Sequence, residues 1–273
     1  MSTPAEWLEA PDAIDAATRR RPFRPFRHAG LCPACRSEVV FAATGPWLRD
    51  QYVCESCHSI PRERAVAAVF RRLVGMRPGL VVHESSPCER GFSRWLAQFC
   101  PGLIRSHYWG PDQPGAVLGG FRNEDLTALT FADDSIDVHI TQDVLEHVFD
   151  VDEVAREIHR TLKPGGMHIF TTPMINKDRA TVQRAVLEDG RVRHLVEPPA
   201  YHGNPISAEG SLVTYDFGFD LVGRIDAASG TRSTARAIDN LRFGIRAEYI
   251  EVVVSVKPGG PAKSGLAPAS RVD

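Results

Sequence analysis

Six cysteines occur in the chain, and four of them form two close pairs whose spacing suits a metal ion. Cys32 and Cys35 are followed, after residues 36–53, by Cys54 and Cys57. Two C-x-x-C turns at this separation are typical of a zinc ribbon, in which each turn supplies two thiolates to one tetrahedral Zn²⁺. Because four protein ligands fill the coordination shell, we predict a structural zinc ion rather than a catalytic one. The alternatives are two redox pairs, four buried free thiols, or a site in which the adjacent His58 replaces the last thiolate.

A second set of reactive side chains lies in the middle of the chain. Asp143, Glu146 and His147 have the i, i+3, i+4 spacing that places side chains on one face of a helical segment. A carboxylate and an imidazole in this arrangement suit a general-base pair or a divalent-metal site next to a substrate. The alternative is that Glu146 and His147 only brace their loop through hydrogen bonds.

The elements around this set predict a strand, a helix and a second strand. Ile136, Val138 and Ile140 form a β-branched run, and Asp150 is a candidate N-cap for a helix whose apolar face includes Ile158. The LKPGG sequence at 162–166 is expected to end that helix, and MHIF to begin the next strand. A βαβ unit favours a parallel sheet whose ligand binds at the carboxyl ends of its strands.

The ordered series LTALTFADDSID, TQDVLEHV and LKPGG at residues 126–166 resembles the fourth-strand region of the class I S-adenosylmethionine-dependent methyltransferases. The resemblance implies an α/β fold with a Rossmann-like seven-stranded sheet, here preceded by a small N-terminal zinc ribbon. Glu146 and His147 correspond to a Glu-His pair that lines the catalytic pocket of ubiquinone-type O-methyltransferases.

The resemblance also implies residues that hold S-adenosylmethionine. Glu84 ends the predicted first strand, 80–84, and corresponds to the acidic residue that holds the methionine end of the cofactor; Asp125 would accept a hydrogen bond from the adenine amino group. The full set of expected cofactor residues is Glu84, Ser85, Ser86, Gly91, Asp125, Leu126, Gln142 and Asp143. The turn after the first strand departs from the family because serines, a proline and a cysteine stand where glycines are expected. This departure leaves open a non-catalytic, zinc-containing scaffold that has lost the cofactor.

The predicted domain organisation has four parts. Residues 1–29 form a basic lead-in, 30–60 the zinc ribbon, 61–258 the methyltransferase domain, and 259–273 a Pro/Gly/Ala/Ser-rich tail expected to be disordered. A helix is expected from Pro61 onward, with its arginines on an exposed face: Arg62, Arg64, Arg71 and Arg72.

An insertion at about 175–213 should form a lid over the acceptor site, because inserted loops at this edge of such sheets commonly cover the substrate. Its candidate acceptor contacts are His194, Glu197, Tyr201, His202 and Asn204. His202 joins Glu146 and His147 as a candidate catalytic residue.

The formal net charge of −2 gives no global attraction to nucleic acid, and no apolar run reaches the roughly 20 residues that span a bilayer. We therefore expect a cytoplasmic protein without membrane contacts that methylates a small-molecule acceptor. An RNA methyltransferase is the alternative, because the lead-in carries an arginine cluster next to aromatic residues that suits phosphate and stacking contacts. The cluster comprises Arg19, Arg20, Arg21, Arg24 and Arg27 with Phe23 and Phe26. A solvated lead-in is the simpler interpretation of the same residues.

Overall fold

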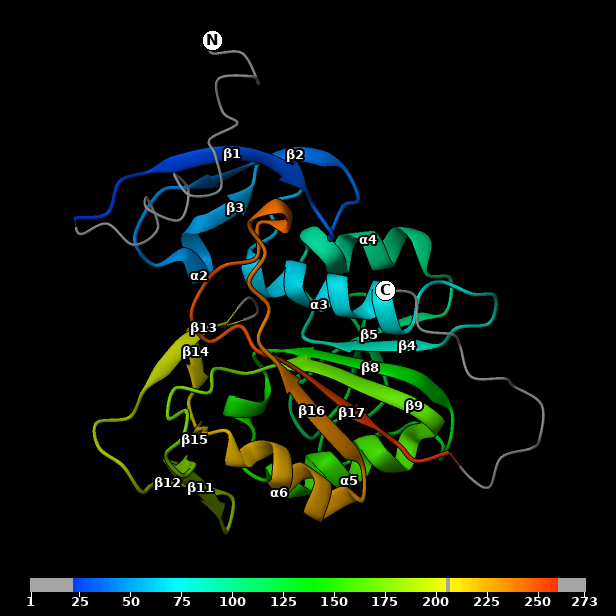
Figure 1. The fold of residues 1–273 in the computed structure, drawn as a ribbon. Helices are drawn as coiled ribbons and strands as arrows, with labels where there is room; N and C mark the ends of the chain where they lie inside the picture. The colour runs from blue at the N-terminus through cyan, green and yellow to red at the C-terminus, as the bar shows by residue number, and fades with distance from the viewer. Residues whose placement is uncertain (1–21, 205–206, 260–273) are drawn as a thin grey trace.

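The computed structural model describes residues 22–204 and 207–259, and the candidate residues Arg19, Arg20 and Arg21 lie outside these ranges, as does the tail from residue 260. Figure 1 shows a small sheet above a larger sheet that has helices on both faces. None of the helices in the described ranges combines the length and the apolar character that a bilayer span requires.

The small sheet contains the two cysteine pairs. It consists of three antiparallel strands in the order β1 (Phe26–Leu31), β2 (Glu38–Ala43) and β3 (Tyr52–Cys54), and a short helix α2 (Leu48–Gln51) joins the last two strands. Strands β2 and β3 thus form an antiparallel hairpin that leads from the first cysteine pair to the second. The sheet begins at Phe26, four residues before the expected boundary at residue 30, because residues 26–29 pair with β2.

The large sheet has eight strands in the order β16-β17-β9-β8-β4-β5-β7-β6. Its parallel part consists of β7 (Phe121–Asn123), β5 (Leu103–His107), β4 (Val82–Ser85), β8 (Ile136–Gln142) and β9 (Leu162–Thr171). An antiparallel pair, β16 (Arg232–Arg236) and β17 (Val252–Val256), completes one edge. The predicted seven-stranded Rossmann-like sheet with an antiparallel hairpin is confirmed, and the two-residue strand β6 (Val117–Leu118) extends its other edge. The preceding helix ends at Thr161, directly before LKPGG as predicted, but LKPGG itself lies within β9, which therefore begins before the expected MHIF.

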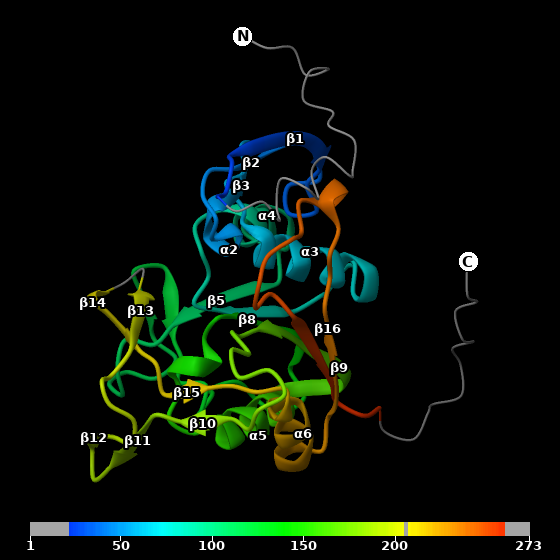
Figure 2. The ribbon, with the colours of Figure 1, turned by 60° about the vertical axis from the view of Figure 1, so that its left-hand side comes forward.

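Four helices sandwich the large sheet (Figures 1 and 2). α3 (Pro61–Leu73) and α4 (Gly91–Phe99) lie on the face toward the small sheet, whereas α5 (Val151–Thr161) and α6 (Asp220–Ser229) pack together on the other face. Asp150 caps α5 as predicted, because its side chain accepts hydrogen bonds from the backbone amides of Asp152 and Glu153.

Arg64 of α3 corrects the expectation that the arginines of this helix are exposed. Its side chain is fully buried, where Nη2 donates to the Tyr52 carbonyl at 2.7 Å and Nε donates to the Gly244 carbonyl at 2.9 Å. The guanidinium carbon lies 4.8 Å from the centre of the Phe41 ring. Since Tyr52 and Phe41 belong to the small sheet and Gly244 to the segment before β17, Arg64 joins three separate parts of the chain.

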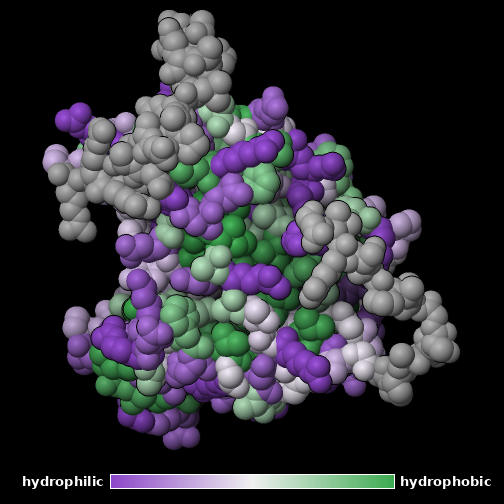
Figure 3. Space-filling model, viewed as in Figure 1, coloured by the Kyte–Doolittle hydropathy of each residue, from purple (hydrophilic) through white to green (hydrophobic). Residues whose placement is uncertain are grey.

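The two sheets also share one hydrophobic core. Phe26, Phe41 and Tyr52 of the small sheet belong to the same buried cluster as Phe70 of α3 and Val82 of β4. Hydrophobic residues gather in the middle of the face in Figure 3, between the small sheet and the lower helices. The small sheet is therefore packed on the main domain as part of its core.

The insertion folds into short antiparallel strand pairs rather than an irregular lid. β11 (Ala185–Glu188) pairs with β12 (Arg191–His194), and β13 (Tyr201–Asn204) pairs with β14 (Ser207–Leu212). β10 (Val182–Gln183) pairs with β15 (Tyr215–Asp216), which follows the insertion. Figures 1 and 2 both place β13 and β14 on the side of the sheet where β8 ends.

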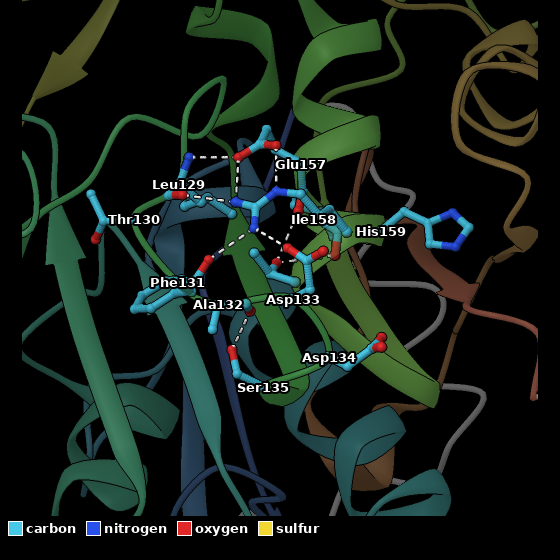
Figure 4. A network of polar contacts seen from close by, with 12 residues as sticks. Leu129, Thr130, Phe131, Ala132, Asp133, Asp134, Ser135, Glu157, Ile158 and His159 are labelled. Atoms are coloured by element: carbon cyan, nitrogen blue, oxygen red, sulfur yellow. Dashed lines mark hydrogen bonds and ion pairs between the residues drawn. The ribbon is translucent and has the colours of Figure 1, made fainter.

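Arg160 of α5 holds the loop before β8 through several hydrogen bonds. Arg160 donates from Nη2 to the Leu129 carbonyl at 2.8 Å, from Nη1 to the Phe131 carbonyl at 2.9 Å, and to Asp133 Oδ1 at 2.6 Å (Figure 4). A cavity of about 300 Å³ lies beside this network, with Asp133 and His159 among its lining residues. Since Asp133 precedes β8, this cavity lies at the amino end of the strand and away from the expected ligand site.

Three neighbouring strands in the middle of the large sheet each carry a buried histidine: His83 of β4, His139 of β8 and His168 of β9. The Nδ1 atoms of His83 and His139 lie 2.8 Å apart, and His168 Nε2 lies 2.9 Å from the Thr141 hydroxyl. Burial lowers the pKa of His83 and of His168 to about 3, and it lowers the pKa of His139 well below its usual value. The folded protein therefore holds all three rings neutral.

Because these three histidines are buried in the neutral form, we expect acid to destabilise the folded protein. Because the unfolded chain protonates each histidine below a pKa of about 6.5 and the folded chain does not, the free energy of unfolding should fall as the pH drops below about 6.5. Each ring should account for about 2 kcal/mol between pH 7.5 and pH 5. Urea unfolding of wild type and His168→Gln at both pH values gives the free energy of unfolding of each protein. The difference between their pH dependences is the effect of one ring, because any loss of zinc in acid affects both proteins equally. An equal pH dependence in the two proteins would contradict the prediction.

Candidate functional site

The four paired cysteines converge on one point, as predicted. Their sulfur atoms lie within 4.8 Å of one another, and Cys32 Sγ lies 3.7 Å from Cys57 Sγ. Ligands about 2.3 Å from a tetrahedral zinc ion are about 3.8 Å apart, so this group fits a structural Zn²⁺. His58 is not part of the group; it has a φ of +60° directly after the last cysteine, as Arg36 has a φ of +65° after the first pair.

The zinc ribbon contacts the turn after β4. The Gly91 amide donates to the Cys57 carbonyl at 3.0 Å, and a Cβ atom at Gly91 would lie only 2.8 Å from the Ser59 Cβ and 2.7 Å from Glu63 Oε2. Gly91 also has a φ of +53°. Close packing against the ribbon therefore accounts for this glycine, and its contact with a cofactor stays a prediction.

Three buried side-chain oxygens at the carboxyl ends of β4 and β8 have no hydrogen-bond partner within the described residues: Glu84 Oε2, Gln142 Oε1 and Glu146 Oε1. Unpartnered buried polar atoms are rare in folded proteins, so a group of them at one edge marks a place where a ligand completes the hydrogen bonding. Glu84 and Gln142 stand at the ends of the neighbouring strands β4 and β8. Both residues were predicted to bind the cofactor.

The turn after β4 takes a glycine-like conformation without glycine at its start. Ser86 has a φ of +53°, and its amide donates to the Ser106 carbonyl at 2.8 Å. Glu84 Oε1 accepts a hydrogen bond from Ser93 at 2.5 Å, and burial raises the pKa of Glu84 to about 7. Ser85 is buried beside it. The serine-containing turn thus includes a left-handed residue, a conformation that glycine adopts more readily.

Asp125 follows β7 and caps its own turn. Its Oδ1 accepts hydrogen bonds from the Thr127 amide at 2.8 Å and from the Thr127 hydroxyl at 2.7 Å. Both of these contacts use the same oxygen, so the role of Oδ2 toward an adenine amino group stays a prediction. The neighbouring Leu126 is buried in the core cluster that lies under α5.

Asp143 is held by two arginines that sequence reasoning missed. Arg49 Nη2, from α2 of the ribbon, lies 2.5 Å from Asp143 Oδ2, and Arg62 Nε of α3 lies 3.0 Å from the same oxygen. Burial alone would raise the pKa of Asp143, but the guanidinium groups of Arg62 and Arg49 hold it below its usual range. No local pattern could reveal these partners, because both arginines lie more than 80 positions earlier in the chain.

Glu146 and His147 lie in a short 3₁₀ turn, Leu145–His147, rather than on an α-helical face, and they are joined by His202 of β13 instead of Asp143. Glu146 Oε1 lies 3.8 Å from His147 Nε2 and 3.8 Å from His202 Nδ1. Burial, and to a smaller extent Asp143, raises the pKa of Glu146 to about 8. These three candidate catalytic residues therefore form one group at the carboxyl end of β8.

The other insertion residues predicted as acceptor contacts are not part of this group. His194 lies in β12, which pairs with β11, while Glu197 and Tyr201 are exposed to solvent. The side chain of Asn204 lies outside the description. At the carboxyl end of β5, Ser106 is buried with its hydroxyl 2.7 Å from His83 Nε2, and His107 is buried against Phe121.

Residues 105–170 of the 273-residue chain match the family model described as a methyltransferase domain. Over these residues the chain is similar to a methyltransferase domain. This match confirms the resemblance to class I S-adenosylmethionine-dependent methyltransferases, and the methyltransferase domain implies S-adenosylmethionine as the methyl donor. None of the curated proteins matches the chain.

Solved methyltransferase structures resemble the chain at low identity. An S-adenosylmethionine-dependent methyltransferase from Mesorhizobium loti is 18% identical, with 71% of this chain and 97% of that chain covered and a TM-score of 0.45. The 1,6-didemethyltoxoflavin-N1-methyltransferase of Burkholderia thailandensis is 15% identical, with 72% and 78% covered and a TM-score of 0.44. These identities are too low to transfer a substrate to this methyltransferase domain.

The arrangement of Asp125 predicts how two substitutions should differ. Asp125→Asn keeps the Oδ1 that caps the turn and replaces Oδ2 with an amide donor, which would face the donor of an adenine amino group. S-adenosylhomocysteine should therefore bind about 10-fold more weakly to Asp125→Asn while the thermal midpoint stays unchanged. Asp125→Ala should lose both the affinity and the turn cap. Isothermal titration calorimetry and thermal unfolding measure the two effects, and wild-type affinity in Asp125→Asn would show that Asp125 only caps the turn.

Proposed function

We propose that this protein transfers a methyl group from S-adenosylmethionine to a small-molecule acceptor bound against Glu146, His147 and His202. The observation that carries the proposal is the unpartnered Glu146 Oε1, which is buried at the carboxyl end of β8 and faces both imidazoles. The carboxyl edge is where ligands bind in sheets of this kind.

The cofactor would lie beside this group. S-adenosylmethionine supplies an activated methyl group when bound, and the buried oxygens of Glu84 and Gln142 suit its polar groups. Ser85, Ser86, Asp125 and the Leu126 amide complete the proposed cofactor set. Asp143 does not bind the cofactor directly in this arrangement, because its carboxylate is already paired with Arg49 and Arg62.

His147 has the geometry of an acceptor-side base. Its Nδ1 lies 2.8 Å from the Leu212 carbonyl of β14, so Nδ1 carries the proton and Nε2 presents a lone pair. Nε2 faces Glu146, and the side chain of His147 is 18% exposed. An acceptor that enters from the solvent side could therefore donate its hydrogen bond to this nitrogen.

Two features favour a small acceptor over RNA. The group lies beneath an insertion hairpin, since the Thr214 amide donates to the Glu146 carbonyl at 2.7 Å directly after β14. The ribbon packs against α3 and the segment before β17, so this part of its surface is not free to bind RNA. The lead-in arginines remain the observation that supports RNA, although Arg27 pairs with Glu55 of the ribbon.

The proposal predicts that a methyl label from S-adenosylmethionine enters the small-molecule fraction of a cell extract rather than the RNA fraction. In His147→Ala, transfer should fall about 100-fold with an unchanged affinity for S-adenosylhomocysteine, because the acceptor side alone is altered. His159→Ala, which changes a partly buried histidine of α5, is the matched control and should transfer normally. Label confined to RNA and lost when the lead-in arginines are replaced would favour the RNA alternative.

A further inference from the structure

We propose that Glu146, His147 and His202 bind a second metal ion, a divalent first-row transition ion separate from the zinc of the ribbon. The proposal deepens the proposed function by naming what occupies the acceptor-side group, but metal binding can be tested without methyl transfer. One carboxylate and two imidazoles are a ligand set that suits such ions, whereas Mg²⁺ and Ca²⁺ prefer oxygen alone.

The ligand atoms lie close to coordination distance. One atom from each residue falls within 4.8 Å of the other two, and Glu146 Oε1 is 3.8 Å from a ring nitrogen of each histidine. Nitrogen and oxygen ligands about 2.1 Å from a tetrahedral ion are about 3.4 Å apart, so each of the two separations from Glu146 Oε1 is about 0.4 Å longer than in a formed site. The histidine rings are perpendicular, at 89°, and their centres are 5.2 Å apart. This orientation lets both rings direct a nitrogen toward Glu146 without stacking.

The surrounding hydrogen bonds have the pattern that supports metal ligands. The bond between His147 Nδ1 and the Leu212 carbonyl fixes the tautomer and leaves Nε2 free as a ligand. Glu146 Oε2 accepts a hydrogen bond from the Thr172 hydroxyl at 2.8 Å, which leaves Oε1 as the ligand atom. Both ligating atoms are thus oriented by neighbours on β14 and directly after β9.

A charge argument gives an independent reason for an ion. Glu146 is 1% exposed, and its Oε1 has no hydrogen-bond partner among the described residues. A carboxyl group at this depth is ionised only where a positive group accompanies it. Arg49 and Arg62 are paired with Asp143 instead. A divalent ion would supply that charge and take the place of the carboxyl proton.

The position of the site indicates the chemistry of the acceptor. Three protein ligands leave at least one coordination position open, and the His202 side chain is 47% exposed. With Nε2 of His147 bound to the ion, the ion takes over the contact with the acceptor: it would bind an oxygen of a hydroxylated acceptor and lower the pKa of its hydroxyl group. We therefore infer an alcohol or phenol as the acceptor class.

Metal counting on intact protein tests the site. Protein that retains its ribbon zinc is dialysed against micromolar Mn²⁺, Co²⁺ or Zn²⁺ and then analysed by elemental mass spectrometry. Wild type should hold one further equivalent of at least one of these ions. Glu146→Gln, which preserves the side-chain shape, and His202→Ala should each hold the ribbon zinc alone, whereas His159→Ala should bind both ions.

The proposal is overturned if wild type holds only the ribbon zinc with all three ions, or if Glu146→Gln and His202→Ala retain the second equivalent. Circular dichroism and the count of ribbon zinc show that each variant is folded. S-adenosylhomocysteine affinity, measured on the same samples, separates the two proposals. Wild type that binds S-adenosylhomocysteine but no second ion contradicts the metal site alone. Wild type that binds the second ion but not S-adenosylhomocysteine contradicts the proposed methyl transfer alone.

Discussion

The buried guanidinium of Arg64 is the constraint on which the arrangement of this protein depends. A fully buried arginine must satisfy its donors, and Arg64 does so with the carbonyls of Tyr52, Ser59 and Gly244. These carbonyls belong to the ribbon, to the turn before α3, and to the segment before β17. The ribbon is thereby fixed over the large sheet, and α2 carries Arg49 to the end of β8. A module that first looks like a separate zinc domain forms part of the wall of the candidate site.

This wall places two nearby carboxyl groups in opposite electrostatic environments. Asp143 has two guanidinium groups within 3.0 Å, whereas Glu146, three residues later, has a threonine hydroxyl and two imidazoles beside its carboxyl group. The first carboxylate is therefore a structural link between ribbon and sheet. The second is the group that we propose for an acceptor or an ion.

The sequence allowed prediction of features whose determinants are close together in the chain. Cysteine spacing predicted the zinc ribbon, and the β-branched run at 136–140 with the Asp150 cap predicted the strand and helix beside the site. The roles of Arg64 and Arg49 could not be predicted, because Arg64 bonds Gly244, 180 positions away, and Arg49 pairs with Asp143, 94 positions away. The helical pattern of α3 indicates which positions are apolar, but it cannot show that carbonyl groups will surround one of its arginines. His202 was predicted as a candidate catalytic residue. Its contact with Glu146 could not be predicted, because it depends on the pairing of β13 with β14.

The central claim is that the carboxyl edge of β4 and β8 binds S-adenosylmethionine although the turn after β4 begins with serines and a proline. Titration of the wild-type, zinc-loaded protein with S-adenosylhomocysteine in a calorimeter tests it most directly. We predict one binding site per chain with a dissociation constant below about 100 μM. The absence of binding heat at a ligand concentration of about 1 mM would contradict the claim and favour a scaffold that has lost its cofactor.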